Sequence, residues 1–311
     1  LVDQELARVE KEKMQALWAE ILNLKAEQIS TDRSFFELGG HSLNAVVLTN
    51  KIRKTFEVTL PVTEVFVKQT IARLCKHLEA LDKTAYTAIP QAPKQAYYPL
   101  SSAQERMYFI NSLATESLAY NMPFLQKFEG RPDAARLEAT LKRLVDRHEI
   151  FRTTFHWIDQ QAKQKIAPSI DIAIEQIQAT TTDLSIVFKN FVQPFDLQKG
   201  PLLRMALAQL PNGDYYLMFD MHHIISDGIS QNVILQDFER LYQGNALSPL
   251  RLQYKDFTHW QQREKGQQLA VQKAFWLDLF ANEPTALNLP LDHARPSQYT
   301  IAGEFYSFRV D

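Results

Sequence analysis

The sequence has one cysteine, few glycines and almost no net charge, and each shortage excludes a class of protein. Among its 311 residues only Cys75 carries a thiol, so an internal disulfide and a multi-cysteine metal cage are excluded. With nine glycines and no GxGxxG or P-loop pattern, a glycine-rich phosphate loop is not expected. The formal charge of −2 offers no basic excess for nucleic acid or an anionic membrane.

Long apolar runs are also missing. No uncharged stretch approaches the roughly 18 residues that a membrane span needs. The first residues, LVDQELARVEKEK, are charged where a secretory leader would be apolar. We therefore expect a cytoplasmic protein without a membrane or nucleic-acid partner, and the length suggests about two domains.

Residues 3–81 have the apolar spacing of amphipathic helices. Positions i, i+3, i+4 and i+7 are apolar in the first two, and a third stripe begins after Gln69. The three stripes are Met14, Leu17, Trp18 and Ile21; Ala45, Leu48, Ile52 and Phe56; and Ile71, Leu74, Cys75 and Leu78. Cys75 lies on such a stripe, so we interpret it as a core thiol and not a catalytic one.

A proline-rich stretch separates this helical part from the rest. Residues 84–99 contain three prolines, no glycine and one charge, which favours an extended connector. We predict a first domain over 1–83, a linker over 84–99 and a second domain over 100–311. Beyond the linker, helical and strand patterns alternate, which indicates an α/β or α+β domain. The expected elements are a helix through 137–145, strands at 151–158 and 166–177, and a hairpin of 202–210 with 215–222.

The first candidate site is Ser42. It follows Gly39-Gly40-His41 and directly precedes the second apolar stripe, so it should start a helix with its hydroxyl exposed on a tight turn. The alternative from these residues alone is that Ser42 is only a helix N-cap.

Leu38-Gly39-Gly40-His41-Ser42-Leu43 resembles the signature of the carrier proteins of acyl and peptidyl transfer. The resemblance covers residues 3–81. It implies a four-helix bundle in which Ser42 receives the cofactor 4′-phosphopantetheine from a phosphopantetheinyl transferase. The thiol of that arm would hold an aminoacyl or peptidyl group as a thioester.

The second candidate site is His222-His223-Ile224-Ile225-Ser226-Asp227-Gly228. Side chains alternate on a strand, so Tyr215, Leu217, Phe219 and Met221 should share a face with His223, and Tyr216, Met218 and Asp220 a face with His222. Only one histidine can then point into a cleft, and the other is a packing residue. Asp227 could instead cap the following helix.

Four segments match, in order, the first four motifs of condensation domains of nonribosomal peptide synthetases of the tyrocidine type. They are 102–108, 147–155, 222–228 and 254–260. The resemblance implies a multidomain fold in which the carrier precedes an α/β, chloramphenicol-acetyltransferase-like condensation domain. Residues 100–311 would hold its N-terminal lobe and the beginning of its C-terminal lobe. The segments at 289–292 and 295–296 also resemble that family.

The resemblance implies amide formation between a peptidyl and an aminoacyl thioester, as in antibiotic biosynthesis. The residues that match the site are His223, His222, Asp227 and Gly228, with His223 in the usual catalytic role. We expect Asp227 to hold its loop through an ion pair with Arg106, Arg152 or an arginine of the second lobe. Gly228 would let a backbone N–H approach the oxyanion.

The resemblance also implies partners and leaves alternatives. Expected partners are the transferase, an upstream adenylation domain, and downstream adenylation and carrier domains. The alternatives are an epimerisation domain, which shares the histidine motif, and a noncatalytic docking fragment. His148 and Glu149 lie at a predicted helix end, where we expect a structural role. No pair of histidines has metal-ligand spacing, so no metal site is predicted.

Overall fold

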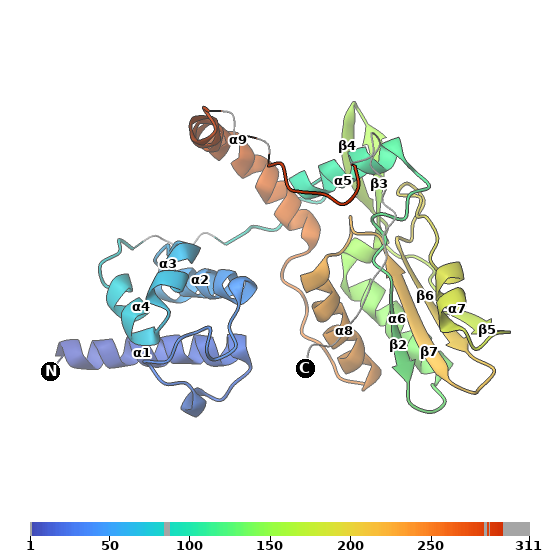
Figure 1. The fold of residues 1–311 in the computed structure, drawn as a ribbon, viewed down its shortest axis with the longest axis horizontal. Coiled ribbons are helices and arrows are strands. Elements are labelled where there is room, and N and C mark those ends of the chain that lie inside the picture. Colours follow the sequence, from blue (N-terminus) through green and yellow to red (C-terminus); the bar gives the residue numbers. More distant parts are fainter. Residues whose placement is uncertain (1, 84–87, 283–284, 286, 295–311) are drawn as a thin grey trace. The chain divides into compact units, whose positions relative to one another are not determined.

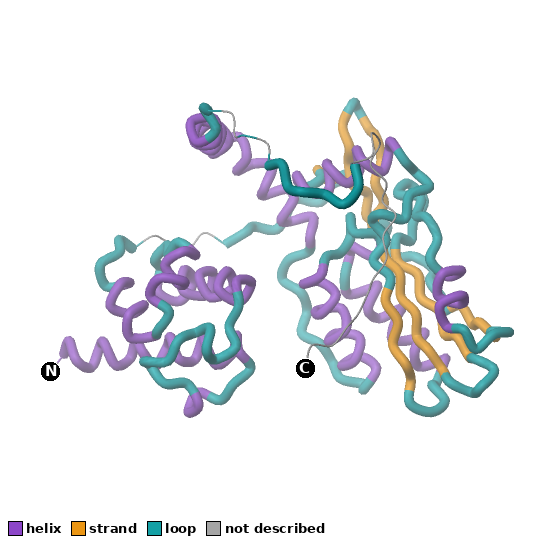
Figure 2. Tube along the Cα trace, viewed as in Figure 1, coloured by secondary structure: helices purple, strands orange, loops and turns teal. Residues whose placement is uncertain are grey.

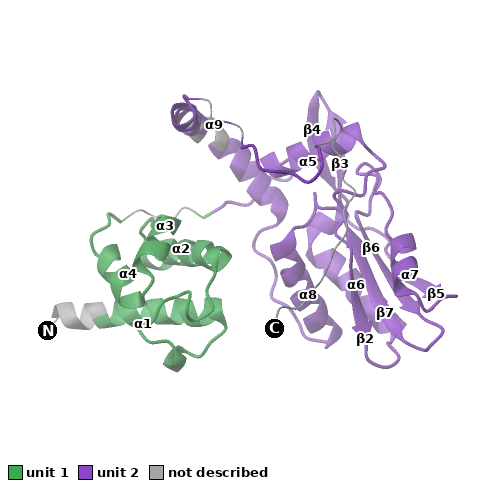
Figure 3. Ribbon diagram, viewed as in Figure 1, with its two compact units in different colours: residues 1–88 green, residues 89–311 purple. Residues whose placement is uncertain are grey.

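The computed structural model describes residues 2–83, 88–282, 285 and 287–294. The chain divides into two compact units, residues 1–88 and 89–311 (Figure 3). Each unit has a hydrophobic core of its own. The two units are therefore described separately.

The first unit is a helical bundle (Figure 1). Its helices are α1 (Val2–Leu22), the short 3₁₀ helix η1 (Ala26–Gln28), α2 (Ser42–Phe56), α3 (Val62–Lys68) and α4 (Ile71–Leu78). The three apolar stripes face the core as predicted, with Trp18 fully buried against the edge of the Phe35 ring. Helix α3 was not visible in the apolar spacing, because it is only seven residues long and buries only Val65.

Cys75 is a core residue of the first unit, as expected. Its side chain is 3% exposed, and burial together with nearby Glu10 raises the pKa of the thiol to about 11. A thiol with that pKa is almost entirely protonated at neutral pH. The interpretation of Cys75 as structural is therefore confirmed.

The chain between the units differs from the linker expected at 84–99. Residues 84–87 lie outside the described residues, but the chain from Ile89 onward forms hydrogen bonds with the rest of the second unit. Arg251 donates to the carbonyl of Ile89 at 3.3 Å, and Asp256 accepts from the backbone N–H of Ala92 at 2.8 Å. Because prolines suit an extended edge segment as well as a free connector, composition could not separate the two.

The second unit is built on two sheets (Figure 2). The larger sheet has the order β2-β7-β6-β5, and only the β5–β6 pair is parallel. The smaller sheet, in the order β1-β4-β3, is antiparallel. The strands are β1 (Tyr98–Pro99), β2 (Phe124–Phe128), β3 (Thr153–Ile158), β4 (Gln161–Ile166), β5 (Glu175–Gln178), β6 (Leu203–Gln209) and β7 (Tyr215–Met221).

Helices cover both faces of the larger sheet (Figure 1). The main core joins Leu217 and Phe219 of β7 to Leu141 of α6 and Phe238 of α8. On the opposite face, Met218 packs with residues of α7 in a smaller core. The helices of this unit are α5 (Ser102–Leu113), α6 (Ala134–Arg147), η2 (Glu149–Arg152), α7 (Leu184–Phe191), α8 (Gly228–Tyr242) and α9 (Tyr254–Leu279).

The predicted hairpin is present as β6 and β7, joined by a turn in which Gly213 has φ +89°. The strand predicted at 166–177 is wrong. The smaller sheet ends at Ile166, and only residues 175–178 form β5. Ile172 and Ile174 lie in a segment without regular secondary structure, and their side chains are buried. Their apolar alternation therefore indicates burial and not the pairing of a strand.

Within the described part of the chain, every helix is too short or too polar to span a bilayer. The same residues hold no cluster of three or more His, Cys, Asp or Glu side chains arranged to bind a metal. The segment at 289–292 is described without regular secondary structure, and the segment at 295–296 lies outside the described residues.

Candidate active site

Ser42 is the first residue of α2, and its side chain is exposed. The N-cap is the preceding residue, His41, whose Nδ1 accepts from the backbone N–H of Asn44 at 3.4 Å. In return, the backbone N–H of His41 donates to the side-chain oxygen of Asn44. The alternative in which Ser42 serves only as the N-cap is therefore wrong, and its hydroxyl is not used as the cap.

The glycines before Ser42 make the tight turn possible. Gly39 has φ +95°, a region that favours glycine. A Cβ on Gly40 would lie 2.4 Å from the Phe35 ring and 2.6 Å from the Phe35 carbonyl oxygen, so only glycine fits there. This packing presents Ser42 to solvent, and the residues present fit a phosphopantetheine attachment site, where an accessible hydroxyl is the one group that is needed.

The predicted alternation of faces is observed along β7 up to the histidines of the second motif. Leu217, Phe219 and Met221 belong to the main core, and Met218 belongs to the core on the other face. Strand β7 ends at Met221, and a single further bridge joins His222 to Asn121. The two rings leave the end of the strand in different environments.

His222 is the buried histidine, with 1% of its surface exposed. Its Nδ1 accepts from the backbone N–H of Ile224 at 3.0 Å, and its ring lies near those of Phe195 and Tyr120. Burial and the neighbouring His223 lower the pKa of His222 to about 4, so the ring is neutral at physiological pH. These contacts are typical of a packing residue.

His223 lines a chamber of about 480 Å³ within the second unit. Its backbone N–H donates to the carbonyl of Tyr120 at 2.8 Å, which fixes the chain at this point. Its Nδ1 is buried and has no hydrogen-bond partner among the described residues. The walls are mostly apolar and include Met107, Phe151, Ile225, Ile229, Val233 and Leu250. A histidine at the wall of a mostly apolar pocket is placed to meet a bound ligand.

Asp227 lines the same chamber, and among the described residues neither Arg106 nor Arg152 forms an ion pair with it, while a pair with an arginine of the second lobe stays a prediction. It is the N-cap of α8, and its Oδ1 accepts from the backbone N–H and the hydroxyl of Ser230, each at 2.7 Å. Partial burial alone would raise the pKa of Asp227, but the Ser230 bonds and His223 lower it on balance. The guanidinium of Arg152 is bonded to backbone carbonyls instead. The alternative role of Asp227 as a helix cap is thus the observed one.

Gly228 is the first residue of α8. A Cβ placed on it would meet no atom within 4 Å among the described residues, so the space beside its backbone is open. That opening is compatible with the approach of an oxyanion to the backbone, and the role itself stays a prediction.

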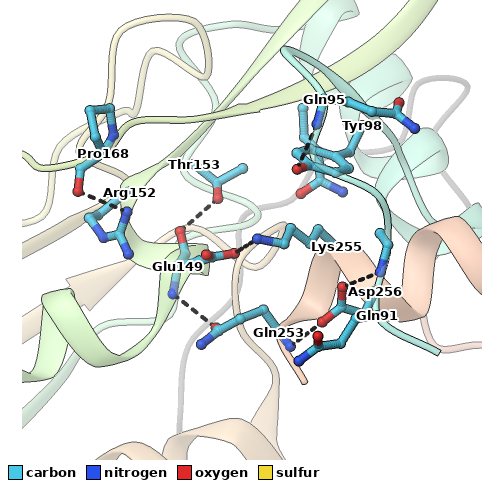
Figure 4. Close-up of polar contacts among 12 residues, drawn as sticks. Gln91, Gln95, Tyr98, Glu149, Arg152, Thr153, Pro168, Gln253, Lys255 and Asp256 are labelled. Carbon is cyan, nitrogen blue, oxygen red and sulfur yellow. Dashed lines mark hydrogen bonds and ion pairs between the residues drawn. The ribbon is translucent and has the colours of Figure 1, made fainter. Parts of the chain in front are cut away.

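The 147–155 motif is a junction that ties three segments together (Figure 4). Glu149 pairs with Lys255 at 2.5 Å, and its backbone N–H donates to the side chain of Gln253 at 3.1 Å. Asp256 in turn holds the backbone of Gln253 and of Ala92, while Arg152 donates to the carbonyl of Pro168. The motif therefore supports the wall of the chamber.

His148 also lines the chamber, from the C-cap of α6. Its Nε2 lies 2.8 Å from Asp237, which also accepts from Arg147 at 2.8 Å. Burial lowers the pKa of His148 despite this carboxylate. The ring is therefore held by a side chain of α8.

Sequence reasoning placed Tyr254 in the fourth motif without giving it a role, and it missed Asp237 and Asn121. Tyr254 lines the chamber and its hydroxyl lies 3.0 Å from that of Ser101. Asp237 contacts His148 from the later helix α8, so no local pattern marks it. The one available signal for Asn121 was its place just before a strand that pairs with β7. Recognising that signal requires the register of the two strands, which no local pattern gives.

Two family models match the chain. Residues 12–78 match the phosphopantetheine attachment site, and residues 94–311 match the condensation domain. The second match covers more than half of the chain, so the chain belongs to the condensation-domain family, and it carries a phosphopantetheine attachment domain before it. The fold class expected from the sequence is confirmed.

Relatives with both parts are peptide synthetases. The chain is 40% identical over 297 residues to tyrocidine synthase 3 and 41% identical over 302 residues to tyrocidine synthase 2, both of Brevibacillus parabrevis. It is 38% identical over 302 residues to bacitracin synthase 3 of Bacillus licheniformis. These alignments cover 95–97% of this chain but only 4%, 8% and 5% of the respective relatives.

Two solved structures have a fold similar to part of this chain. The X-domain in its complex with OxyB from teicoplanin biosynthesis has a TM-score of 0.61 and 28% identity, covering 69% of this chain and 50% of that one. The starter condensation domain of rhizomide synthetase has a TM-score of 0.53 and 23% identity, covering 61% and 49%. At that identity the second likeness shows the fold alone.

Proposed function

We propose that this chain is a carrier and condensation pair of a nonribosomal peptide synthetase, in which Ser42 is the attachment residue and His223 the catalytic one. The observation that carries the proposal is that an exposed serine on a glycine turn and a histidine at the wall of an apolar chamber lie in the two matched domains of one chain. We propose a carrier domain over 1–83 and a condensation domain over 100–311, against which the end of the connecting segment, from Ile89 onward, is hydrogen-bonded.

Phosphopantetheine, when bound, supplies a thiol that holds an acyl group as a thioester. Ser42 needs only to be reachable, since a phosphopantetheinyl transferase would activate it. No neighbouring base is therefore needed at this serine, and its place as the first residue of α2 keeps the hydroxyl outside the core. Adenylation domains and a downstream carrier would supply the aminoacyl and peptidyl thioesters, and we expect the protein to act in the cytoplasm.

The proposed reaction forms one C–N bond and breaks one C–S bond. The amine of the acceptor attacks the thioester carbonyl, the thiolate leaves, and the proton lost by the amine ends on the thiolate. An α-amino group titrates near pH 8, so a useful share is already neutral at pH 7 and a strong base is not required. His223 would orient the amine and take its proton late in the step.

The neighbours of His223 have supporting roles in this proposal. His222 packs beneath the strand end, Asp227 caps α8, and Gly228 leaves room for a backbone N–H to approach the oxyanion. His222 and Asp227 hold the loop around His223, and the proton transfer is left to His223.

The attachment residue is tested by intact mass after treatment with coenzyme A and a phosphopantetheinyl transferase. We expect one adduct on the chain, none on Ser42→Ala, and an unchanged adduct on the control Ser30→Ala, which removes another exposed hydroxyl of the same unit. An adduct that persists on Ser42→Ala would show that another side chain is modified.

A noncatalytic docking function is the second candidate, because the X-domain of similar fold is described in complex with a protein, OxyB. An epimerisation function is the third, since it shares the histidine motif. Incubation with an L-aminoacyl carrier and chiral analysis separates them: D-product indicates epimerisation, amide product supports condensation, and neither product supports docking.

A further inference from the structure

The strand that precedes the histidines is paired beyond the end of the regular sheet. The register of β2 with β7 places Phe124 opposite Phe219. Carried three residues further, the same register places Asn121 opposite His222, where an isolated bridge is observed. The backbone N–H of His223 then donates to the Tyr120 carbonyl at 2.8 Å, and that of Met122 donates to the Met221 carbonyl at 2.8 Å. Residues 120–122 therefore hold the backbone of both histidines.

The side chain of Asn121 adds two bonds to this backbone pairing. Its Nδ2 donates to Asp220 Oδ2 at 2.7 Å and to the carbonyl of Gln193 at 2.9 Å. Asp220 is the diagonal neighbour of Asn121 across the strand pair, on the face that also carries His222. Both protons of one amide thus join three segments: the edge strand, β7, and the loop after α7.

Asp220 is fully buried, and its charge is only partly compensated. Arg204 Nε lies 3.9 Å from Asp220 Oδ2, and the guanidinium stacks on the Phe195 ring at 3.8 Å. Burial raises the pKa of Asp220 to about 6. Asp220 Oδ1, Asn121 Oδ1 and His222 Nε2 are buried without a hydrogen-bond partner among the described residues.

Such a cluster is a costly way to stabilise a core. Buried polar groups that are incompletely paired cost free energy, and apolar residues of similar size would often stabilise a fold as well or better. What the cluster does supply is a fixed geometry, because each bond is directional. The elements that it fixes meet at the turn bearing His222 and His223.

We propose that Asn121 is a positioning residue for His223, acting through Asp220 and the backbone of Tyr120 to hold the histidine at the chamber wall. Where the inference concerns turnover it rests on the proposed condensation function. Where it concerns the position of His223 it does not, because that position can be measured without a substrate.

The position is measured by amide hydrogen exchange and imidazole NMR signals of His223 in the full chain. We expect Asn121→Ala to exchange the His223 amide about tenfold faster or more, and to move the His223 ring signals. The control Asn245→Ala removes an exposed side-chain amide that donates to the side chain of Gln243, and should leave both unchanged. Wild-type exchange and ring signals in Asn121→Ala would overturn the inference.

Turnover is measured as kcat and KM for the acceptor in the parent synthetase. Asn121→Ala should lower kcat by about 10- to 100-fold with little change in KM, because a displaced catalytic group costs rate more than binding. If kcat falls only in proportion to the fraction of folded protein, Asn121 has a structural role alone and the inference is overturned. A wild-type protein that forms no amide would refute the proposed function, while the exchange result would still stand.

Rescue gives a second variant if Asn121→Ala folds poorly. Asn121→Asp loses the donor and brings two carboxylates together, and Asp220→Asn loses the acceptor charge. In the double variant N121D/D220N the amide and the carboxylate exchange places, so the bond between them can form again. We expect the double variant to recover His223 protection and part of kcat relative to Asn121→Asp. A double variant no better than Asn121→Asp would contradict a role of this pair.

Discussion

The neutral, buried His222 should make the second unit sensitive to acid. Burial and His223 lower the pKa of His222 from 6.5 to about 4. The unfolded chain therefore takes up a proton near pH 6.5 that the folded chain refuses until about pH 4. The contribution of the neutral His222 to the free energy of unfolding is complete above pH 6.5 and is lost as the pH falls towards 4. The difference corresponds to roughly 3 kcal/mol when the loss is complete.

The perturbation is His222→Asn. The oxygen of asparagine can replace Nδ1 as the acceptor for the Ile224 N–H, now 3.0 Å away, but it does not titrate. His222→Leu is the matched comparison, because it removes both the proton and the acceptor and should cost about 1–3 kcal/mol at every pH. The two variants together separate the hydrogen bond from the charge.

The assay is urea unfolding of the full chain at about pH 7.5 and about pH 4.5. Stability differences between wild type and variant are compared at each pH, so that contributions of the first unit cancel. Wild type should lose roughly 2–3 kcal/mol more than His222→Asn between the two pH values. An equal acid loss in wild type and His222→Asn would refute the reasoning, since it would mean that the His222 proton is not excluded by the fold.

Two further predictions follow from the observed contacts of Asp227 and Cys75. Asp227→Asn should keep the helix cap and melt close to wild type, whereas Asp227→Ala should cost about 1 kcal/mol in thermal unfolding. A loss of 3–5 kcal/mol in Asp227→Asn would instead reveal a buried ion pair. Cys75 should react with a thiol reagent only after unfolding, as followed by absorbance, because its thiol is buried with a pKa of about 11. Rapid reaction of the folded chain would contradict that assignment.

Local patterns predicted the elements whose burial is periodic. The stripe of Met14 and Trp18, the helix through Leu141, and the hairpin around Gly213 all follow from spacing or turn chemistry. The same reasoning failed at 166–177, where Ile172 and Ile174 alternate without a pairing strand. Periodicity reports which side chains are buried, and pairing depends on segments that are distant in sequence.

The sequence predicted those features of the site that lie within a single strand or a single turn. Alternation along β7 separates His222 from His223, and the glycines before Ser42 indicate an exposed helix start. Of the two roles considered for Asp227, the helix cap is the one observed, because a carboxylate at a helix start accepts locally, from Ser230. Asn121 was missed because its function depends on register, which no single segment contains.

The most direct test of the central claim is single-turnover amide formation in the parent synthetase, from a donor held on Ser42 to an acceptor amine. We predict that His223→Ala removes most of the amide product while its melting temperature stays close to that of wild type, and that the control Asn245→Ala retains the product. Amide formation by His223→Ala at the rate of that control would contradict the account.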